Sequence, residues 1–145
     1  MKKLIIAFVA VGTLISTSAF AGGREKINPA LTTFQKEFKG AVDVKWNEGK
    51  DAITAAFVLN NSRVEAYFDY TGELIGTARN VVFTQLPLAV VKELSNRYES
   101  APIYDIIEYT KGADTFYDMI VETPTKKLRV RATVAGDVSV VKKIK

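Results

Sequence analysis

The sequence of 145 residues contains no cysteine and no histidine. Without cysteine no disulfide can form, so a domain of this size must be stabilised by its hydrophobic core. Without either residue, a Ser-His-Asp triad, a Cys-His dyad and the ordinary zinc and transition-metal sites are excluded. The glycines form neither a GxGxxG nor a GxxxxGK[ST] pattern, so no phosphate-binding loop is predicted. We therefore expect no cofactor and no metal site.

Carboxylate chemistry is the remaining route to an enzyme. A glycosidase-like pair needs two acids held in a cleft with separated pKa values. The acidic residues of this chain fall at strand edges and turn tips, which are usually solvated. We therefore expect no enzymatic activity and no catalytic residue.

The first 21 residues are typical of a signal peptide. Lys2 and Lys3 precede an uncharged apolar run from Leu4 to Ile15, and Ala-Phe-Ala at 19–21 has the pattern that signal peptidase recognises. The apolar run is too short to span roughly 30 Å of hydrocarbon as a helix. We predict cleavage after Ala21, export to the periplasm or the exterior, and no stable membrane insertion of the mature chain.

The charge of the mature chain gives little indication of a partner. The full chain carries 20 basic and 16 acidic residues, a net charge of +4. Lys2 and Lys3 leave with the signal peptide, so 18 basic residues then face 16 acidic residues. A net charge of about +2 does not indicate nucleic acid or an anionic membrane as the partner.

Hydropathy patterns predict two helices. The first begins with Asn28 as N-cap and Pro29 at the first helical position, and ends at Gly40. The second covers residues 85–98 and again has a proline near its start. Apolar residues at helical spacing form one stripe on each helix: Leu31, Phe34 and Phe38 on the first, and Leu88, Val91, Leu94 and Tyr98 on the second.

Eight strands are predicted, four after each helix. They cover residues 42–46, 52–59, 63–69, 73–78, 103–110, 115–123, 127–133 and 137–143. A shift of 64 residues aligns 52–79 with 116–143 and places Gly72 on Gly136. We therefore predict an α+β fold of two tandem helix-plus-antiparallel-β-sheet (αββββ) repeats, about 29–79 and about 84–143, with the helices packed on one sheet face. In this scheme residues 22–28 are a short N-terminal lead and residues 29–145 are the domain.

Alternating hydropathy assigns the faces of the strands. Val64, Ala66 and Phe68, like Leu128, Val130 and Ala132, are predicted to face the core. A turn at residues 123–126 places Glu122 opposite Lys127 and Asp118 opposite Arg131, two cross-strand pairs of opposite charge. The segment DYTGE at 69–73 is predicted as a tight turn with Gly72 in a left-handed conformation.

In the order and spacing of these elements the chain resembles the PepSY-like domains grouped with the β-lactamase-inhibitor-like (BLIP-like) fold. These are small exported proteins of Bacteroidetes-type bacteria. The resemblance implies two tandem α+β units, no known activity and an inhibitory or binding role. It covers residues 27 to about 142 and rests on Phe34, Phe38, Trp46, Phe68, Gly72, Leu86, Pro87 and Tyr98.

The outer sheet face holds the candidate partner-binding residues: Tyr67, Phe116, Ile120, Arg129 and Arg131. Phe116 and Ile120 are predicted to point away from the core beside residue types that interfaces favour. Scattered apolar residues are also normal on any surface, and that alternative stays open. The hypothesis is a non-catalytic binding module, inhibitor-like, that docks an unknown protein or peptide of the envelope on its open sheet face. The alternative is a small-ligand carrier with a groove between the sheet and the helices.

Overall fold

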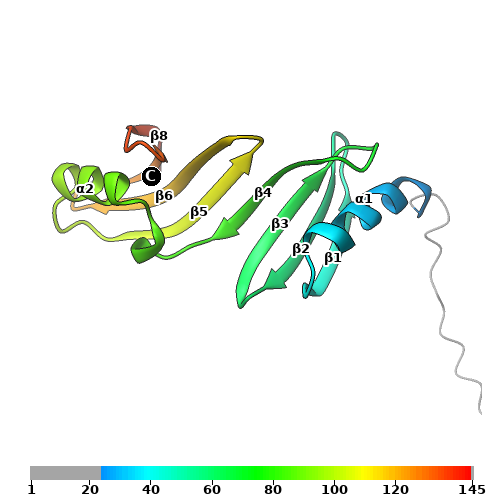
Figure 1. The fold of residues 1–145 in the computed structure, drawn as a ribbon. Coiled ribbons are helices and arrows are strands. Elements are labelled where there is room, and N and C mark those ends of the chain that lie inside the picture. Colours follow the sequence, from blue (N-terminus) through cyan, green and yellow to red (C-terminus); the bar gives the residue numbers. More distant parts are fainter. Residues whose placement is uncertain (1–23, 145) are drawn as a thin grey trace, which may run out of the picture.

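The computed structural model describes residues 24–144, and the predicted signal peptide at residues 1–21 lies outside them. No helix among the described residues is long and apolar enough to cross a membrane. Figure 1 shows the order of the elements. They are α1 (Arg24–Glu37), β1 (Val42–Glu48), β2 (Ile53–Leu59), β3 (Ser62–Phe68), β4 (Leu74–Asn80), the 3-10 helix η1 (Phe83–Gln85), α2 (Leu88–Arg97), β5 (Ile103–Lys111), β6 (Asp114–Thr123), β7 (Lys126–Thr133) and β8 (Val138–Ile144).

The strands form a single eight-stranded antiparallel sheet in the order β1 to β8. Strand β4 pairs with β5 through residues 77–80 and 107–110, so no sheet edge separates the two groups of four strands. The predicted fold class of two tandem helix-plus-sheet repeats is therefore wrong, and the protein is mostly β with two α-helices (Figure 1). The error has a physical cause. Alternating hydropathy indicates the face of a side chain, but it does not indicate whether one hairpin group pairs with the next.

Helix α1 begins earlier than predicted. It starts at Arg24, so Asn28 is not its N-cap and Pro29 lies inside the helix. A proline inside a helix removes the hydrogen bond to the carbonyl four residues earlier, and for Pro29 that carbonyl belongs to the first turn. The capping signal at residues 28–29 therefore did not mark the helix start.

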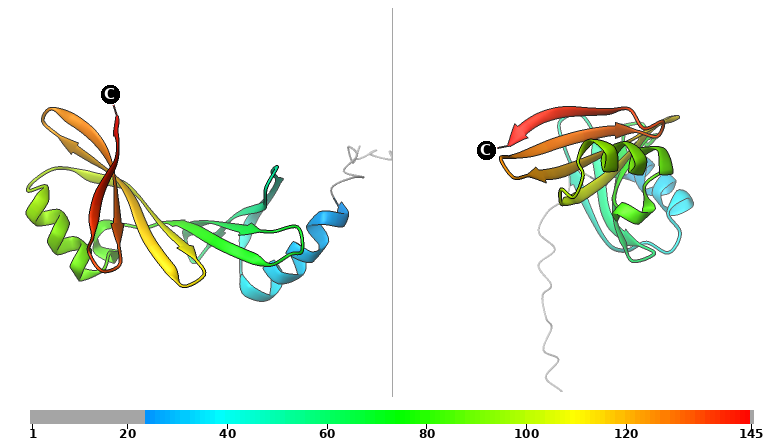
Figure 2. Two further views of the ribbon diagram at one scale, coloured as in Figure 1. Left: turned by 90° about the horizontal axis from the view of Figure 1, so that it is seen from above. Right: turned by 90° about the vertical axis from the view of Figure 1, so that its left-hand side faces the viewer.

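Both helices cover the same face of the sheet (Figure 2). The strand register places Val64, Arg79, Glu108, Tyr117 and Ala132 side by side in one row on that face. Val64 and Tyr117 lie on either side of Arg79 and Glu108 in this row. Each belongs to a different buried cluster.

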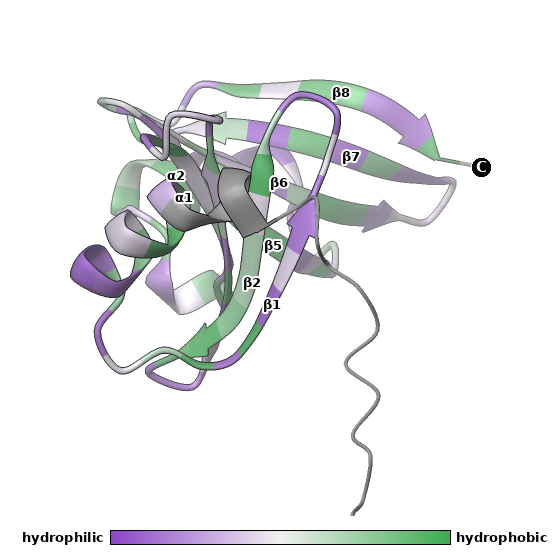
Figure 3. Cartoon of the chain, turned by 90° about the vertical axis from the view of Figure 1, so that its right-hand side faces the viewer, coloured by the Kyte–Doolittle hydropathy of each residue, from purple (hydrophilic) through white to green (hydrophobic). Residues whose placement is uncertain are grey.

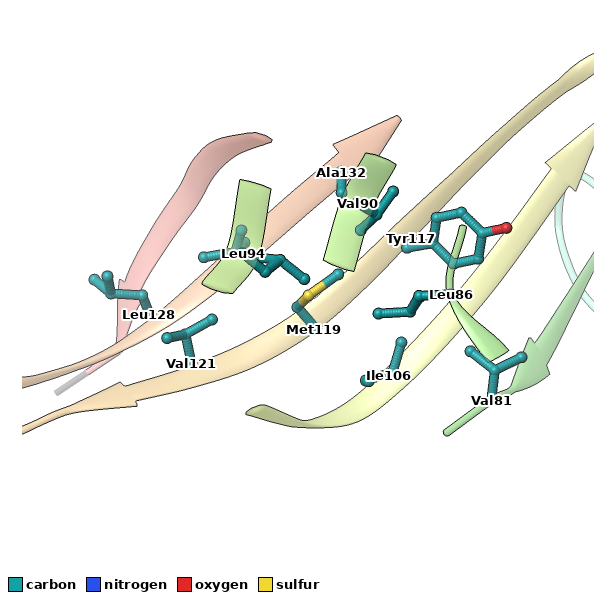
Figure 4. Packing of buried hydrophobic residues seen from close by; sticks show 11 residues of the cluster. Val81, Leu86, Val90, Leu94, Ile106, Tyr117, Met119, Val121, Leu128 and Ala132 are labelled. Carbon is teal, nitrogen blue, oxygen red and sulfur yellow. The ribbon is translucent and has the colours of Figure 1, made fainter. Parts of the chain in front are cut away.

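The first cluster packs α1 against β2 and β3. The second cluster, shown in Figure 4, packs η1 and α2 against β5, β6 and β7. All six strand residues predicted to face the core are buried: Val64, Ala66, Phe68, Leu128, Val130 and Ala132. The prediction of the core face is therefore confirmed for β3 and β7.

A polar seam separates the two clusters on the helix-covered face. Arg79 of β4 donates to Glu108 of β5, with Nε 2.6 Å from Oε1 and Nη2 3.1 Å from Oε2. The next row across the same strands consists of Thr77 and Thr110. The hydrophobic core is therefore divided in two although the sheet is continuous.

The turn between β3 and β4 is held by one carboxylate and one glycine. The Asp69 Oδ1 accepts hydrogen bonds from the backbone N–H groups of Thr71 and Glu73, each at 2.9 Å. Gly72 has φ +88, which confirms the predicted left-handed conformation. A Cβ on Gly72 would lie 2.5 Å from the Pro29 carbonyl carbon, so the turn packs directly against α1.

Candidate binding face

The face of the sheet opposite α1 and α2, here called the open face, carries most of the candidate residues. One row across it is formed by Glu65, Ala78, Tyr109, Phe116 and Thr133, which lie opposite one another in register. Hydropathy differs between the strands beneath this face: the edge strand β1 is mainly hydrophilic and its neighbour β2 is mainly hydrophobic (Figure 3).

Aromatic and charged side chains stack across β5, β6 and β7 on the open face. The rings of Tyr109 and Phe116 lie 5.1 Å apart between centroids, with an interplanar angle of 19°. The guanidinium carbon of Arg131 lies 4.1 Å from the centroid of Phe116, within the range of a cation–π contact. We call Tyr109, Phe116 and Arg131 the aromatic stack.

Asp118 fixes the orientation of Arg131. Its carboxylate accepts two hydrogen bonds, from Nε at 2.7 Å to Oδ1 and from Nη2 at 2.8 Å to Oδ2. Such fork-to-fork pairs are directional as well as charge-assisted. The pairing of Asp118 with Arg131 confirms the predicted register of β6 and β7, as does the Glu122–Lys127 pair, with Oε2 3.7 Å from Nζ.

Tyr67 is held on the same face by a hydrogen bond within its own strand. Its hydroxyl donates to Glu65 Oε2 at 2.8 Å. Burial of the phenol, together with this hydrogen bond to a carboxylate, raises the pKa of Tyr67 to about 12. The Tyr67 hydroxyl is therefore protonated over the whole physiological pH range.

An apolar depression of about 240 Å³ lies between Tyr67 and the aromatic stack. The residues that line it are Tyr67, Ile75, Gly76, Thr77, Tyr109, Thr110, Lys111 and Phe116. Gly76 lies opposite Tyr67 in register. A Cβ on Gly76 would lie 2.8 Å from the Thr110 carbonyl oxygen, so the close approach of β4 and β5 requires glycine there. We call this depression the anchor pocket.

The structure brings together three of the five predicted site residues. Tyr67 and Phe116 line the anchor pocket, and Arg131 stacks on Phe116. Arg129 is exposed but lies opposite Ile120, away from the pocket. The expected exposure of Ile120 is wrong, because its side chain is only 9 % accessible. Its neighbours in register, Tyr104 on β5 and Arg129 on β7, flank it on the open face.

Tyr109, Ile75 and Gly76 were not predicted from the sequence as site residues. Strand β5 carries a bulge between Tyr104 and Ile107, with Asp105 at φ 51, and the bulge changes which residues of the strand face outward. Ile75 lies at a second irregularity, between the pairs Tyr67–Gly76 and Phe68–Leu74. The hydropathy of β5 does not locate its bulge, because apolar residues occur at both parities of this strand.

Three carboxylates of the open face are engaged in fixed contacts. Glu65 accepts from Tyr67, Asp118 accepts from Arg131 and Glu122 is paired with Lys127. Within residues 24–144 no group of three acidic side chains is close enough to hold a metal ion.

A second depression, of about 310 Å³, lies between the C-terminal end of α2 and β5. Phe83, Leu94, Tyr98 and Ile103 contribute to its wall. The Tyr98 hydroxyl is buried and has no hydrogen-bond partner among the described residues. This depression is the nearest counterpart of the predicted groove between the sheet and the helices.

The fold is similar to that of several solved bacterial proteins. No family model and no curated protein matches the chain. Solved structures do match: a BLIP-like protein of Bacteroides fragilis at 18 % identity and TM-score 0.70, covering 81 % of this chain and 85 % of that one. A Bacteroides eggerthii protein, provisionally described as periplasmic, matches at 16 % identity and TM-score 0.70, covering 81 % and 86 %.

A DUF2874 family protein of Bacteroides uniformis matches at 14 % identity and TM-score 0.69, covering 80 % of this chain and 86 % of that one. At such identities the likeness shows the fold alone. It supports the BLIP-like part of the predicted resemblance, and none of these three proteins is described as PepSY-like.

Proposed function

We propose that this chain is an exported, non-catalytic and inhibitor-like binding module that docks a protein or peptide of the cell envelope on its open face. The observation that carries the proposal is the aromatic stack beside the anchor pocket. Rings held by stacking and by a paired arginine lose little conformational freedom when a partner binds. Tyr, Phe and Arg are also the residue types that dominate binding hot spots.

Export is supported by the predicted signal peptide and by the provisional periplasmic description of the B. eggerthii neighbour. The PepSY-like assignment rests only on the residues quoted above. The likeness to a BLIP-like structure motivates the inhibitory part of the proposal, and the proposed target is an envelope protein.

The proposal is tested by affinity capture from a native envelope extract. The purified chain is immobilised beside the Phe116→Ser variant, which removes the centre of the aromatic stack. Leu88→Ser serves as the matched control, since it makes a comparable change at an exposed apolar residue of α2. We expect the same envelope protein to be retained by the wild type and by Leu88→Ser, and lost with Phe116→Ser.

The measured quantity is the ratio of retained protein between the two variants. Retention that survives Phe116→Ser would contradict docking on the open face. Equal loss in both variants would also contradict it, because the bound surface would then include the helices.

A small-ligand carrier is the second candidate function. The depression at the end of α2 and the unpartnered Tyr98 hydroxyl favour it, because a buried polar group without a partner is costly. Native mass spectrometry of the purified protein would show a co-purified compound if this function holds. A single mass equal to that of the bare chain would exclude a retained ligand and leave the docking function.

A further inference from the structure

The anchor pocket is one of three depressions that follow one another across the open face. The first, of about 410 Å³, lies over β1, β2 and β3 and is lined by Lys45, Ala56, Val58 and Arg63 among others. The second, of about 70 Å³, is lined by Arg63 and by Tyr109. Tyr109 also lines the anchor pocket, so shared side chains connect the three into one track across the strands.

The two ends of this track differ in chemistry. The anchor pocket is mainly apolar, and Lys111 is the one charged residue among those that line it. The opposite end holds Lys45 and Arg63, which form no ion pair within residues 24–144, and Asp43 is the one carboxylate in its wall. Glu65 lines the second depression together with Arg63 and accepts a hydrogen bond from the Tyr67 hydroxyl. The track therefore offers an apolar site at one end and, at the other, two cations that form no ion pair with the described carboxylates.

The distance between Arg63 and Tyr67 of the anchor pocket follows from β3. Arg63 and Tyr67 lie on this strand, on the same face and four residues apart. At a rise of about 3.3 Å per residue their Cα atoms are separated by roughly 13 Å. An extended peptide has nearly the same rise, so it spans this distance with about four residues.

We infer that the partner presents an acidic, extended segment whose apolar side chain fills the anchor pocket and whose carboxylate, about four residues away, pairs with Arg63 and Lys45. This inference rests on the proposed function and specifies the chemistry of the partner. Apolar burial supplies affinity, while opposite charge at the far end sets the direction in which the segment lies. A basic segment would instead be repelled by Arg63 and Lys45.

The inference is tested by selecting a displayed library of random twelve-residue peptides against the purified chain. We expect enriched sequences to combine an aromatic or large aliphatic residue with Asp or Glu three to five positions away. A synthetic consensus peptide should then bind roughly tenfold more weakly to Arg63→Glu than to the wild type. It should also lose affinity for Phe116→Ser and weaken as salt is added.

Lys92→Glu is the matched control, because it makes the same kind of charge reversal at an exposed residue of α2. The consensus peptide should bind it as it binds the wild type. Enriched peptides without acidic residues that still fail to bind Phe116→Ser would overturn the acidic segment and leave the proposed function standing. Peptides indifferent to Phe116→Ser would count against both, and a selection without a common pattern would overturn the inference.

Discussion

Replacing Gly72 by alanine tests the contact between the sheet and α1. Gly72 lies in the turn between β3 and β4 at φ +88. A Cβ there would lie 2.5 Å from both the carbonyl carbon and the Cβ of Pro29 and 2.7 Å from its oxygen. The nearest atoms are mostly backbone, so a rotamer change cannot relieve the overlap, and either α1 or the turn must move.

Two separate costs add to give the expected effect. A residue with a Cβ in the left-handed region is less stable than glycine by about 1–2 kcal/mol. Overpacking against a fixed neighbour costs a further 1–3 kcal/mol, roughly. We therefore expect Gly72→Ala to lower the free energy of unfolding by about 2–5 kcal/mol, a large part of the roughly 5–15 kcal/mol typical of a domain.

Urea denaturation followed by tryptophan fluorescence measures this free energy. Trp46 is the only tryptophan of the chain, and its ring lies 5.2 Å from that of Phe34 on α1. The control is Gly112→Ala, where φ is +58 but no atom lies within 4 Å of the new Cβ. The control should lose only the backbone part, about 1–2 kcal/mol. Equal losses in the two variants would refute the packing of this turn against α1.

Three further predictions concern the open face. Ile120→Ser should lower the free energy of unfolding by roughly 2–5 kcal/mol in the same assay, because the side chain is buried, and by clearly more than Phe116→Ser. Equal effects would place both side chains in solvent or both in the core. Because its pKa is raised above the ordinary 10, the protonated Tyr67 stabilises the fold; this contribution is complete below pH 10 and lost as pH rises toward about 12. Tyr67→Phe should make the free energy of unfolding less sensitive to pH in that window. In an ultraviolet titration the variant should lack the phenol that ionises near pH 12. Loss of a phenol that ionises near pH 10 would contradict the raised pKa of Tyr67. A double-mutant cycle on Asp118 and Arg131, whose side chains are 15 % and 43 % exposed, should give a coupling free energy of about 1 kcal/mol that falls with salt. A coupling free energy of zero at low salt would show that Asp118 does not hold Arg131 in place in solution.

Local pairing could be predicted from the sequence. The β6–β7 hairpin is an example: its short turn fixes the register, and the charges of Glu122 and Lys127 then lie opposite each other as expected. The buried positions of β3 and β7 follow from the same two-residue period. These features depend on residues that are close together in the chain.

Features that depend on distant residues or on bulges could not be predicted. The bulge at Asp105 places Tyr104 and Ile107, three residues apart, on the same face, so simple alternation gives the wrong face for half of β5. Tyr109 is on the open face for this reason. Ile120 has the predicted face, but its burial depends on neighbours from β5 and β7 that the pattern of β6 alone does not contain.

The anchor pocket exists because the sheet is continuous from β4 to β5. On the helix-covered face, the Arg79–Glu108 pair separates two cores that could each belong to its own sheet. On the open face of the same two strands, the pairing of β4 with β5 brings Tyr67 within reach of Tyr109 and Phe116. Two separate sheets would leave these rings apart and the pocket without one wall. A binding site at this position therefore requires the β4–β5 pairing, and a variant that broke that pairing would lose the pocket even if both cores stayed folded.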